Sequence, residues 1–118
     1  MACENKNVNK IVELLDSKSA EDIVVLDVKT LTTICDYFII ATGKNDRLVK
    51  ALADKLEDET AKDNIYPVNK DGYKSGDWIL TAFDDIIVHI FKPETRQFFD
   101  LERVWKDAVV VDISDLIK

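Results

Sequence analysis

The side chains best suited to chemistry lie in the stretch 83–91, which reads FDDIIVHIF. Two adjacent carboxylates, Asp84 and Asp85, precede the only histidine of the chain, His89. A histidine can act as a general base or a metal ligand, and paired carboxylates can hold metal ions for phosphoryl transfer. A zinc site needs three or four ligands, but no second histidine and no cysteine stands at ligand spacing from His89. Neighbouring residues of a strand point to opposite faces, so Asp84 and Asp85 do not converge on one ion and are better interpreted as a turn.

The motifs of other common enzymes are also missing from the sequence. No serine stands in a GxSxG elbow, and no GxGxxG or GxxxxGK[ST] loop is present. Cys3 and Cys35 form no CxxC or Cys/His pattern, which is typical of reduced thiols in a cytosolic protein. We therefore expect no catalytic residue, no metal site and no cofactor. For His89, a structural role in the core and a role in a protein interface both stay open.

The composition narrows the class of partner. The chain has 118 residues, 47% hydrophobic and 33% charged, which we interpret as a single domain over residues 1–118. Its net charge is −7, and no run of Lys or Arg supplies the basic face that nucleic-acid binders need, so a basic protein partner is expected instead. No apolar run approaches the ~20 residues of a membrane span, and the start MACENKNVNK has no apolar signal core. These features predict a cytoplasmic protein without a membrane segment.

Hydrophobic periodicity divides the chain into helices and strands. In the first half of the chain it predicts a helix over about 6–18, strands over 23–28 and 37–42, and a long helix from Lys44 or Asn45. In the second half it predicts an edge strand over 65–68 with Pro67, strands over 78–83 and 86–91, a helix from Pro93, and a last strand over 109–113. The strand at 37–42 is apolar on both faces, which predicts a central position. Helical spacing places four apolar residues after Pro93 on one side: Phe98, Leu101, Val104 and Trp105.

The strands 78–83 and 86–91 read as a hairpin with Asp84-Asp85 as its two-residue turn. This register puts Trp78 opposite Phe91 and Leu80 opposite His89. Alternation gives two faces, one with Ile79, Thr81, Phe83, Ile86, Val88 and Ile90, the other with Trp78, Leu80, Ala82, Ile87, His89 and Phe91. Two or three helices cannot fully cover both apolar faces. We expect the face with Trp78 and His89 to be only partly covered, and such an exposed patch marks an interaction site.

The ordered motifs of the chain resemble the RsfS/Iojap family of ribosomal silencing factors. The matching segments are LDVKTLTTICDYFIIATGKNDRLVKALAD (26–54), SGDW (75–78), DIIVHIF (85–91) and RQFFDLERVW (96–105). The resemblance implies an α/β fold, a nucleotidyltransferase-like mixed β-sheet with two to three packed helices and no retained catalysis. It also implies binding to large-subunit ribosomal protein number fourteen, where the factor would obstruct joining of the subunits and repress translation when nutrients are scarce. A homodimer is a further implication.

Seven residues stand at family positions and are the expected protein-binding residues: Tyr37, Asp77, Trp78, Asp85, His89, Asp100 and Glu102. Trp78 is the expected apolar anchor, with His89 beside it. The carboxylates of Asp77, Asp85 and Glu102 are expected to meet basic groups of the partner. The alternative is a divergent metal-dependent nucleotidyltransferase that would use Asp27, Asp36 or Asp85.

One departure from the family concerns the hairpin tip. The family usually reads Tyr-Gly-Asp where this chain has Phe83, Asp84 and Asp85. Glycine suits the positive φ of a tight primed turn, whereas aspartate adopts it at some cost. A longer or differently shaped tip is therefore expected, without the hydrogen bonds of the family's phenol hydroxyl.

Overall fold

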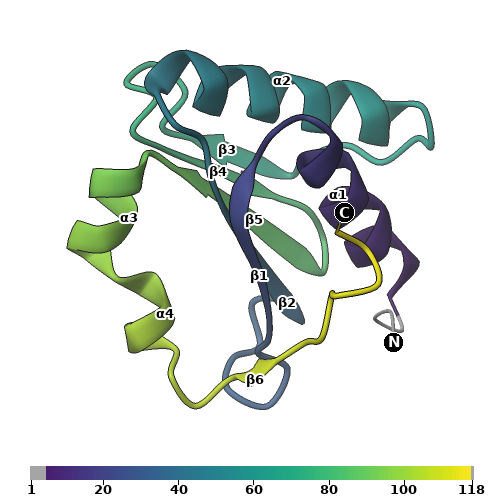
Figure 1. Ribbon diagram of the computed structural model, residues 1–118. Coiled ribbons are helices and arrows are strands. Elements are labelled where there is room, and N and C mark those ends of the chain that lie inside the picture. The colour runs from purple at the N-terminus through teal and green to yellow at the C-terminus, as the bar shows by residue number, and fades with distance from the viewer. Residues whose placement is uncertain (1–4, 118) are drawn as a thin grey trace.

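The protein forms a mixed six-stranded sheet with helices against it, as seen in a computed structural model that describes residues 5–117 (Figure 1). The elements in chain order are α1 (Lys6–Ser17), β1 (Glu21–Asp27), β2 (Tyr37–Thr42), α2 (Asp46–Ala61), β3 (Asn69–Asp71), β4 (Trp78–Ala82), β5 (Ile86–Phe91), α3 (Pro93–Phe99), α4 (Leu101–Val104) and β6 (Val109–Val110). The strand order is β3-β4-β5-β2-β1-β6, with β2 and β5 parallel and the other neighbours antiparallel. The mixed α/β architecture predicted from the sequence is confirmed.

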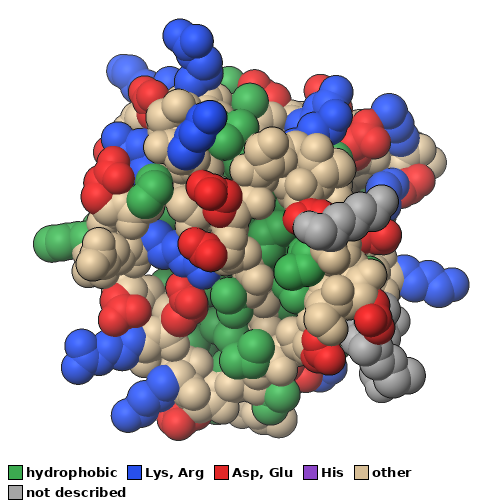
Figure 2. All heavy atoms as spheres, in the orientation of Figure 1, with side chains coloured by type: hydrophobic (Ala, Val, Ile, Leu, Met, Phe, Trp, Pro, Cys, Tyr) green, Lys and Arg blue, Asp and Glu red, His purple; other side chains and the backbone are tan. Residues whose placement is uncertain are grey.

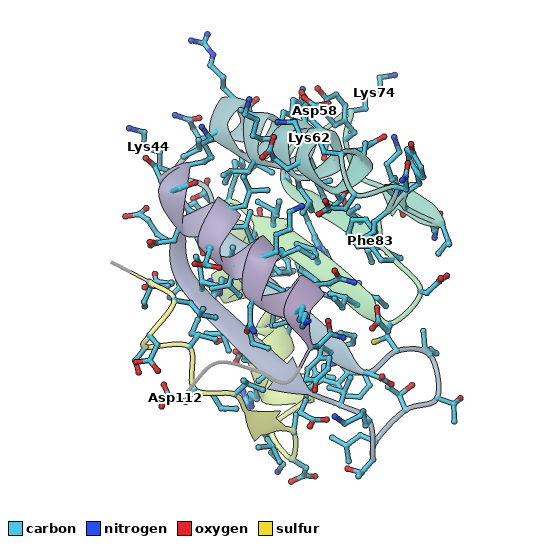
Figure 3. All side chains as sticks on the ribbon, turned by 90° about the vertical axis from the view of Figure 1, so that its right-hand side faces the viewer. Lys44, Asp58, Lys62, Lys74, Phe83 and Asp112 are labelled. Carbon is cyan, nitrogen blue, oxygen red and sulfur yellow. The ribbon has the colours of Figure 1, made fainter. Side chains whose placement is uncertain are left out.

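The two long helices, α1 and α2, cover one face of the sheet. Asn5 and Asn45 cap them, because the Asn5 side chain accepts from two backbone N–H groups of the first turn and the Asn45 side chain accepts from one. Their apolar stripes pack on the odd-numbered residues of β2 and the even-numbered residues of β5 to form the larger core cluster. The opposite side of α2 is charged and faces solvent, where Asp58 and Lys62 point outward in Figure 3.

Strand β2 is the centre of the sheet, as its sequence predicts. All six of its side chains are buried, and it lies between β1 and β5. The predicted register of the β4–β5 hairpin is also confirmed, with Trp78 opposite Phe91 and Leu80 opposite His89. Its two faces therefore divide as alternation requires.

The hairpin tip keeps two residues, so of the two expected alternatives, a longer tip or one of a different shape, the longer tip does not form. The N–H of Phe83 donates to the carbonyl of Ile86 at 2.7 Å and closes the turn. Neither Asp84 nor Asp85 has a positive φ, so the turn is not of the primed kind. Aspartate consequently carries no left-handed strain at the position of the family's glycine.

Two expected elements are displaced in the structure. The edge strand lies at 69–71 instead of 65–68, because the N–H of Ile65 caps the end of α2 by donating to the Thr60 carbonyl. The expected single helix after Pro93 is broken at Asp100, whose φ of 49° and ψ of 54° are left-handed. This break puts Phe98 and Val104 outward, with exposed fractions of 80% and 71%, while Leu101 and Trp105 face the sheet.

Cys35 is a free thiol in the core, and burial raises its pKa to about 11, whereas Cys3 lies outside the described residues. Within residues 5–117 none of the helices combines the length and apolar character needed to cross a membrane.

Candidate protein-docking site

The second face of the sheet, turned away from α1 and α2, carries the candidate site. Its buried core consists of Leu26, Val28, Cys35, Phe38, Ile40 and Phe91. The α4 helix and the residues after it pack over this core with the side chains of Leu101, Trp105 and Ala108, which are only partly buried. At the β4 end, Trp78 and Leu80 keep part of their surface exposed. The expectation that this face is incompletely covered agrees with the structure.

Trp78 is fixed in this surface by contacts on two sides. Its indole ring stacks on buried Phe91 with ring centroids 4.8 Å apart and an interplanar angle of 29°. Its Nε1–H donates a hydrogen bond to Nδ1 of His89 at 3.1 Å. A large apolar side chain that is held in one orientation and still partly exposed is well suited to anchor a partner.

His89 lies beneath Trp78 and has only 4% of its surface exposed. Its ring also meets Phe38 edge-on, with centroids 5.0 Å apart. Burial lowers its pKa to about 4, so the imidazole is neutral near pH 7. Because Nδ1 accepts the indole proton, Nε2 carries the remaining proton, and this buried nitrogen has no hydrogen-bond partner among residues 5–117. His89 therefore supports Trp78 from below.

The loop before β4 sets where Trp78 enters the sheet. Gly72 has a φ of +85°, and a Cβ atom there would lie 1.9 Å from the carbonyl oxygen of Trp78. Only glycine allows the loop to pass so close to the strand. Asp77 is joined to the start of α3 twice, since its carbonyl accepts from the Lys92 N–H at 2.9 Å and its carboxylate lies 3.0 Å from Lys92 Nζ.

Asp100 and Glu102 belong to the segment that flanks this surface. Glu102 accepts from Arg96 Nε at 2.9 Å. The same guanidinium donates to Thr42 Oγ1 at 2.8 Å and to the Asp22 carbonyl at 2.7 Å, so it fastens α3 to the end of the sheet. Asp100 stands at the left-handed junction of α3 and α4. Glu102 is thus engaged within the chain and helps to position α3.

Tyr37 and Asp85 lie apart from Trp78. Tyr37 is buried on the face covered by α1 and α2, where Lys29 Nζ donates to its hydroxyl at 2.9 Å. Asp85 stands at the opposite end of β5, six residues before Phe91, the partner of Trp78, and so about 20 Å along the strand at ~3.3 Å per residue. Its carboxylate accepts from Asn5 Nδ2 at 2.7 Å. The structure therefore brings together Asp77, Trp78 and His89, with Asp100 and Glu102 on the neighbouring segment.

Two aromatic residues of this region were missed by reasoning from the sequence. Phe99 is 49% exposed and has its ring 5.0 Å from that of Trp78, and Phe98 adjoins Phe99 at 5.1 Å. Helical spacing had placed Phe98 on the same side of one helix as Leu101 and Trp105. The adjacent pair of phenylalanines just before an acidic residue was the available signal, because two neighbouring positions of a helix cannot share one buried side.

The structure offers no ready metal centre in the part of the chain that it describes, since no three His, Cys, Asp or Glu side chains are grouped there. Asp36 and Asp85 are neighbours, because the Asp36 N–H donates to the Asp85 carbonyl at 2.9 Å. Asp27, the third carboxylate of the nucleotidyltransferase alternative, forms an ion pair with Lys29, whose Nζ lies 3.4 Å away.

Comparisons with known proteins agree with the motifs. A family model described as "Ribosomal silencing factor during starvation" (RsfS) matches residues 2–118. The chain is 34% identical to "Ribosomal silencing factor RsfS" of Bacillus subtilis (strain 168), over 84% of each chain. It is 29% identical to "Mitochondrial assembly of ribosomal large subunit protein 1" of Mus musculus, covering 84% of this chain and 45% of the mouse protein. A crystal structure of a Chromobacterium violaceum protein superposes with a TM-score of 0.82 at 32% identity, covering 88% of both chains.

Proposed function

The chain belongs to the family of ribosomal silencing factors, and from this premise we propose that it binds the large ribosomal subunit through ribosomal protein number fourteen. Bound there, it obstructs joining of the two subunits and so represses translation under nutrient limitation. A steric block of this kind requires a specific protein contact and no bond-making, in keeping with a non-enzymatic role. The name of the mouse relative, which refers to assembly of the large subunit, supports the choice of subunit.

The observation that carries this proposal is the partly exposed Trp78 on the incompletely covered face of the sheet. Trp78 is held by Phe91 and His89, so little side-chain entropy is lost when a partner covers it. The neighbouring Asp77 and the net charge of −7 favour a basic partner, as ribosomal proteins commonly are. Asp77 and Trp78 are the proposed contacts, with His89 and Glu102 in supporting positions.

The test is sedimentation with purified ribosomal subunits. The protein should co-sediment with free large subunits, stay off free small subunits, and lower the fraction of joined ribosomes when the two are mixed. Binding without any effect on joining would contradict the steric block, and no binding to large subunits would contradict the proposed function itself.

A homodimer and a cytoplasmic location belong to the same proposal. The homodimer is implied by the family resemblance and is supported by the open edge of β6, where Val109 and Val110 are exposed. Light scattering during gel filtration would show a mass near twice 13.5 kDa if it forms. The cytoplasmic location follows from the site of subunit joining.

A further inference from the structure

A continuous row of aromatic rings leads from the core to the surface of α3. Phe91, fully buried, stacks on Trp78, Trp78 meets Phe99, and Phe99 meets Phe98 at an interplanar angle of 90°. Every neighbouring pair has centroids between 4.8 and 5.1 Å apart, within the range of favourable aromatic contact. Single exposed phenylalanines are ordinary, but an exposed pair joined to the core marks a surface that a partner covers. In Figure 2 hydrophobic side chains stand at the surface over α3, at the left of the view, among acidic and basic ones.

The last three rings of this row line a surface hollow of about 310 Å³. Its full lining is Ser75, Asp77, Trp78, Glu94, Thr95, Phe98 and Phe99, and we call it the α3 hollow. The lining combines these three rings with two hydroxyl side chains and two carboxylates, of which Glu94 has the more exposed side chain. A site with aromatic faces beside a carboxylate fits a cation that also has an apolar surface.

The charges around the hollow leave the Glu94 carboxylate available to pair with a cation of the partner. Lys92 Nζ lies 3.0 Å from Asp77 but 3.8 Å from Glu94, so its ammonium is committed mainly to Asp77. Two carboxylates against one ammonium leave one net negative charge at the rim. An incoming cation can therefore pair with Glu94 without displacing Lys92 from Asp77.

The hollow is formed before any partner arrives. Arg96 fastens α3 to Thr42 and to the Asp22 carbonyl, and the N-cap residue Lys92 is hydrogen-bonded to Asp77. The left-handed Asp100 ends the helix directly after Phe99 and turns the chain back toward the sheet. A preformed site pays little ordering entropy on binding.

We propose that the α3 hollow receives an arginine side chain of the ribosomal protein partner, with the guanidinium against the Phe98 and Phe99 rings and paired with Glu94. Guanidinium is planar, so it stacks on an aromatic face and presents a fork of donors to a carboxylate, whereas the lysine ammonium is a more strongly hydrated point charge. A phosphate group is disfavoured here, because the rim is acidic. This inference rests on the proposed function and extends the docking surface from Trp78 onto α3.

The proposal is tested by measuring how strongly variants of the hollow, and matched control variants outside it, bind purified large subunits. Phe98→Ser is expected to weaken binding at least tenfold, and Glu94→Gln about threefold with a smaller dependence on salt. Val104→Ser alters a similarly exposed residue of α4 outside the hollow, and Asp58→Asn alters an exposed carboxylate of α2, so both should bind within twofold of the wild type. All four positions are exposed, and circular dichroism would confirm that each variant is folded.

The arginine itself is tested in the isolated ribosomal protein. Its surface arginines are replaced by lysine one at a time and assayed against the wild-type chain and Phe98→Ser. One of these arginine-to-lysine replacements should weaken binding to the wild-type chain at least threefold. The same replacement should not weaken binding to Phe98→Ser any further, because the two contacts are coupled.

The inference is overturned if Phe98→Ser and Glu94→Gln bind large subunits normally while Trp78→Ala loses binding, a result that leaves the proposed function standing. It is also overturned if Phe98 is needed for binding to protein-free ribosomal RNA. Failure of the wild type to bind large subunits would instead remove the proposed function.

Discussion

Trp78 and His89 are joined across the β4–β5 pair by a hydrogen bond from the indole Nε1–H to the imidazole Nδ1, 3.1 Å long. Leu80 stands directly opposite His89, so Trp78 reaches the imidazole along the diagonal of the ladder. The bond needs a neutral imidazole, since a protonated ring has no acceptor. The protonation state of a buried histidine therefore controls how the proposed anchor is held.

The first prediction concerns pH. Burial lowers the pKa of His89 to about 4 from its ordinary value of 6.5, so below pH 6.5 the unfolded chain binds a proton that the folded chain does not. The contribution of His89 to the free energy of unfolding should be complete above pH 6.5, fall as the pH decreases toward 4, and level off below it. Over the whole window the loss is about 3 kcal/mol. Urea unfolding from pH 7.5 to 3.5 measures it.

The control for this prediction is His89→Phe, which keeps an aromatic ring and removes the titration. The carboxylates titrate in both proteins, so their contributions to the pH dependence of the free energy of unfolding cancel in the comparison. Equal pH slopes for the wild type and His89→Phe would show that His89 is not held neutral in the fold.

The second prediction concerns the anchor. Trp78→Ala should weaken binding to large subunits by ~2 kcal/mol or more, about thirtyfold, as removal of a central interface aromatic does. The domain should remain folded, because Phe91 beneath it is enclosed by the rest of the smaller core cluster. Trp105→Phe, at the end of α4 where the ring packs edge-on against Phe38 of the same face, should bind normally. A folded Trp78→Ala protein with unchanged affinity would remove Trp78 from the site.

The third prediction concerns the loop that leads into β4. Gly72→Ala forces a Cβ against the Trp78 carbonyl at a φ of +85°, and should lower the free energy of unfolding by about 2 kcal/mol or more. Gly76→Ala has a φ of +71°, but the nearest atoms to its Cβ, Asp46 Cβ and Lys50 Cε, lie 3.0 Å away instead of 1.9 Å, so about 1 kcal/mol is expected. Urea denaturation of both variants gives the comparison, and a smaller loss for Gly72→Ala than for Gly76→Ala would refute the account of the loop.

Local patterns in the sequence were sufficient for the parts of the fold that depend on local rules. A two-residue turn at Asp84-Asp85 fixes the register of β4 against β5, and an apolar run without polar positions fixes β2 as central. The neighbourhood of Trp78 and His89 followed from that register alone. Alternation along a strand is a strict geometric rule, so it transfers from sequence to structure.

The parts of the structure that the sequence did not predict depend on tertiary contacts, which hydrophobic periodicity does not reveal. Helical spacing continues through Asp100, but that residue adopts a left-handed conformation while Arg96 holds α3 to the sheet end through Thr42 and Asp22. Propensity is a weak prior against such contacts, and the break separates exposed Phe98 from Leu101 and Trp105, with which helical spacing had grouped it. The edge strand shifted for a similar reason, because Ile65 was needed to cap α2.

The fourth prediction concerns Arg96. Replacing it by glutamine removes hydrogen bonds to Glu102, Thr42 and the Asp22 carbonyl, and these three bonds at ~1 kcal/mol each should cost about 3 kcal/mol of stability. Limited proteolysis should then cut faster within 93–108, since that segment loses its fastening. Arg103→Gln, at an exposed position of α4, should leave both measurements within the range of surface substitutions. Unchanged proteolysis of Arg96→Gln would show that α3 is held without Arg96, by its aromatic contacts and the Lys92–Asp77 pair.

The fifth prediction separates a binding protein from a nucleotidyltransferase. Catalysis of that kind would need carboxylates converging on a metal ion, drawn from Asp27, Asp36 and Asp85. Asp27 lies 3.4 Å from the Lys29 ammonium and Asp85 accepts from Asn5, so a metal ion would have to compete for both groups. Calorimetric titration with nucleoside triphosphate and magnesium should therefore give no binding in the micromolar range. Micromolar binding that disappears in Asp85→Ala but persists in Asp84→Ala, an exposed neighbour at the same turn, would replace the steric block by an enzymatic role.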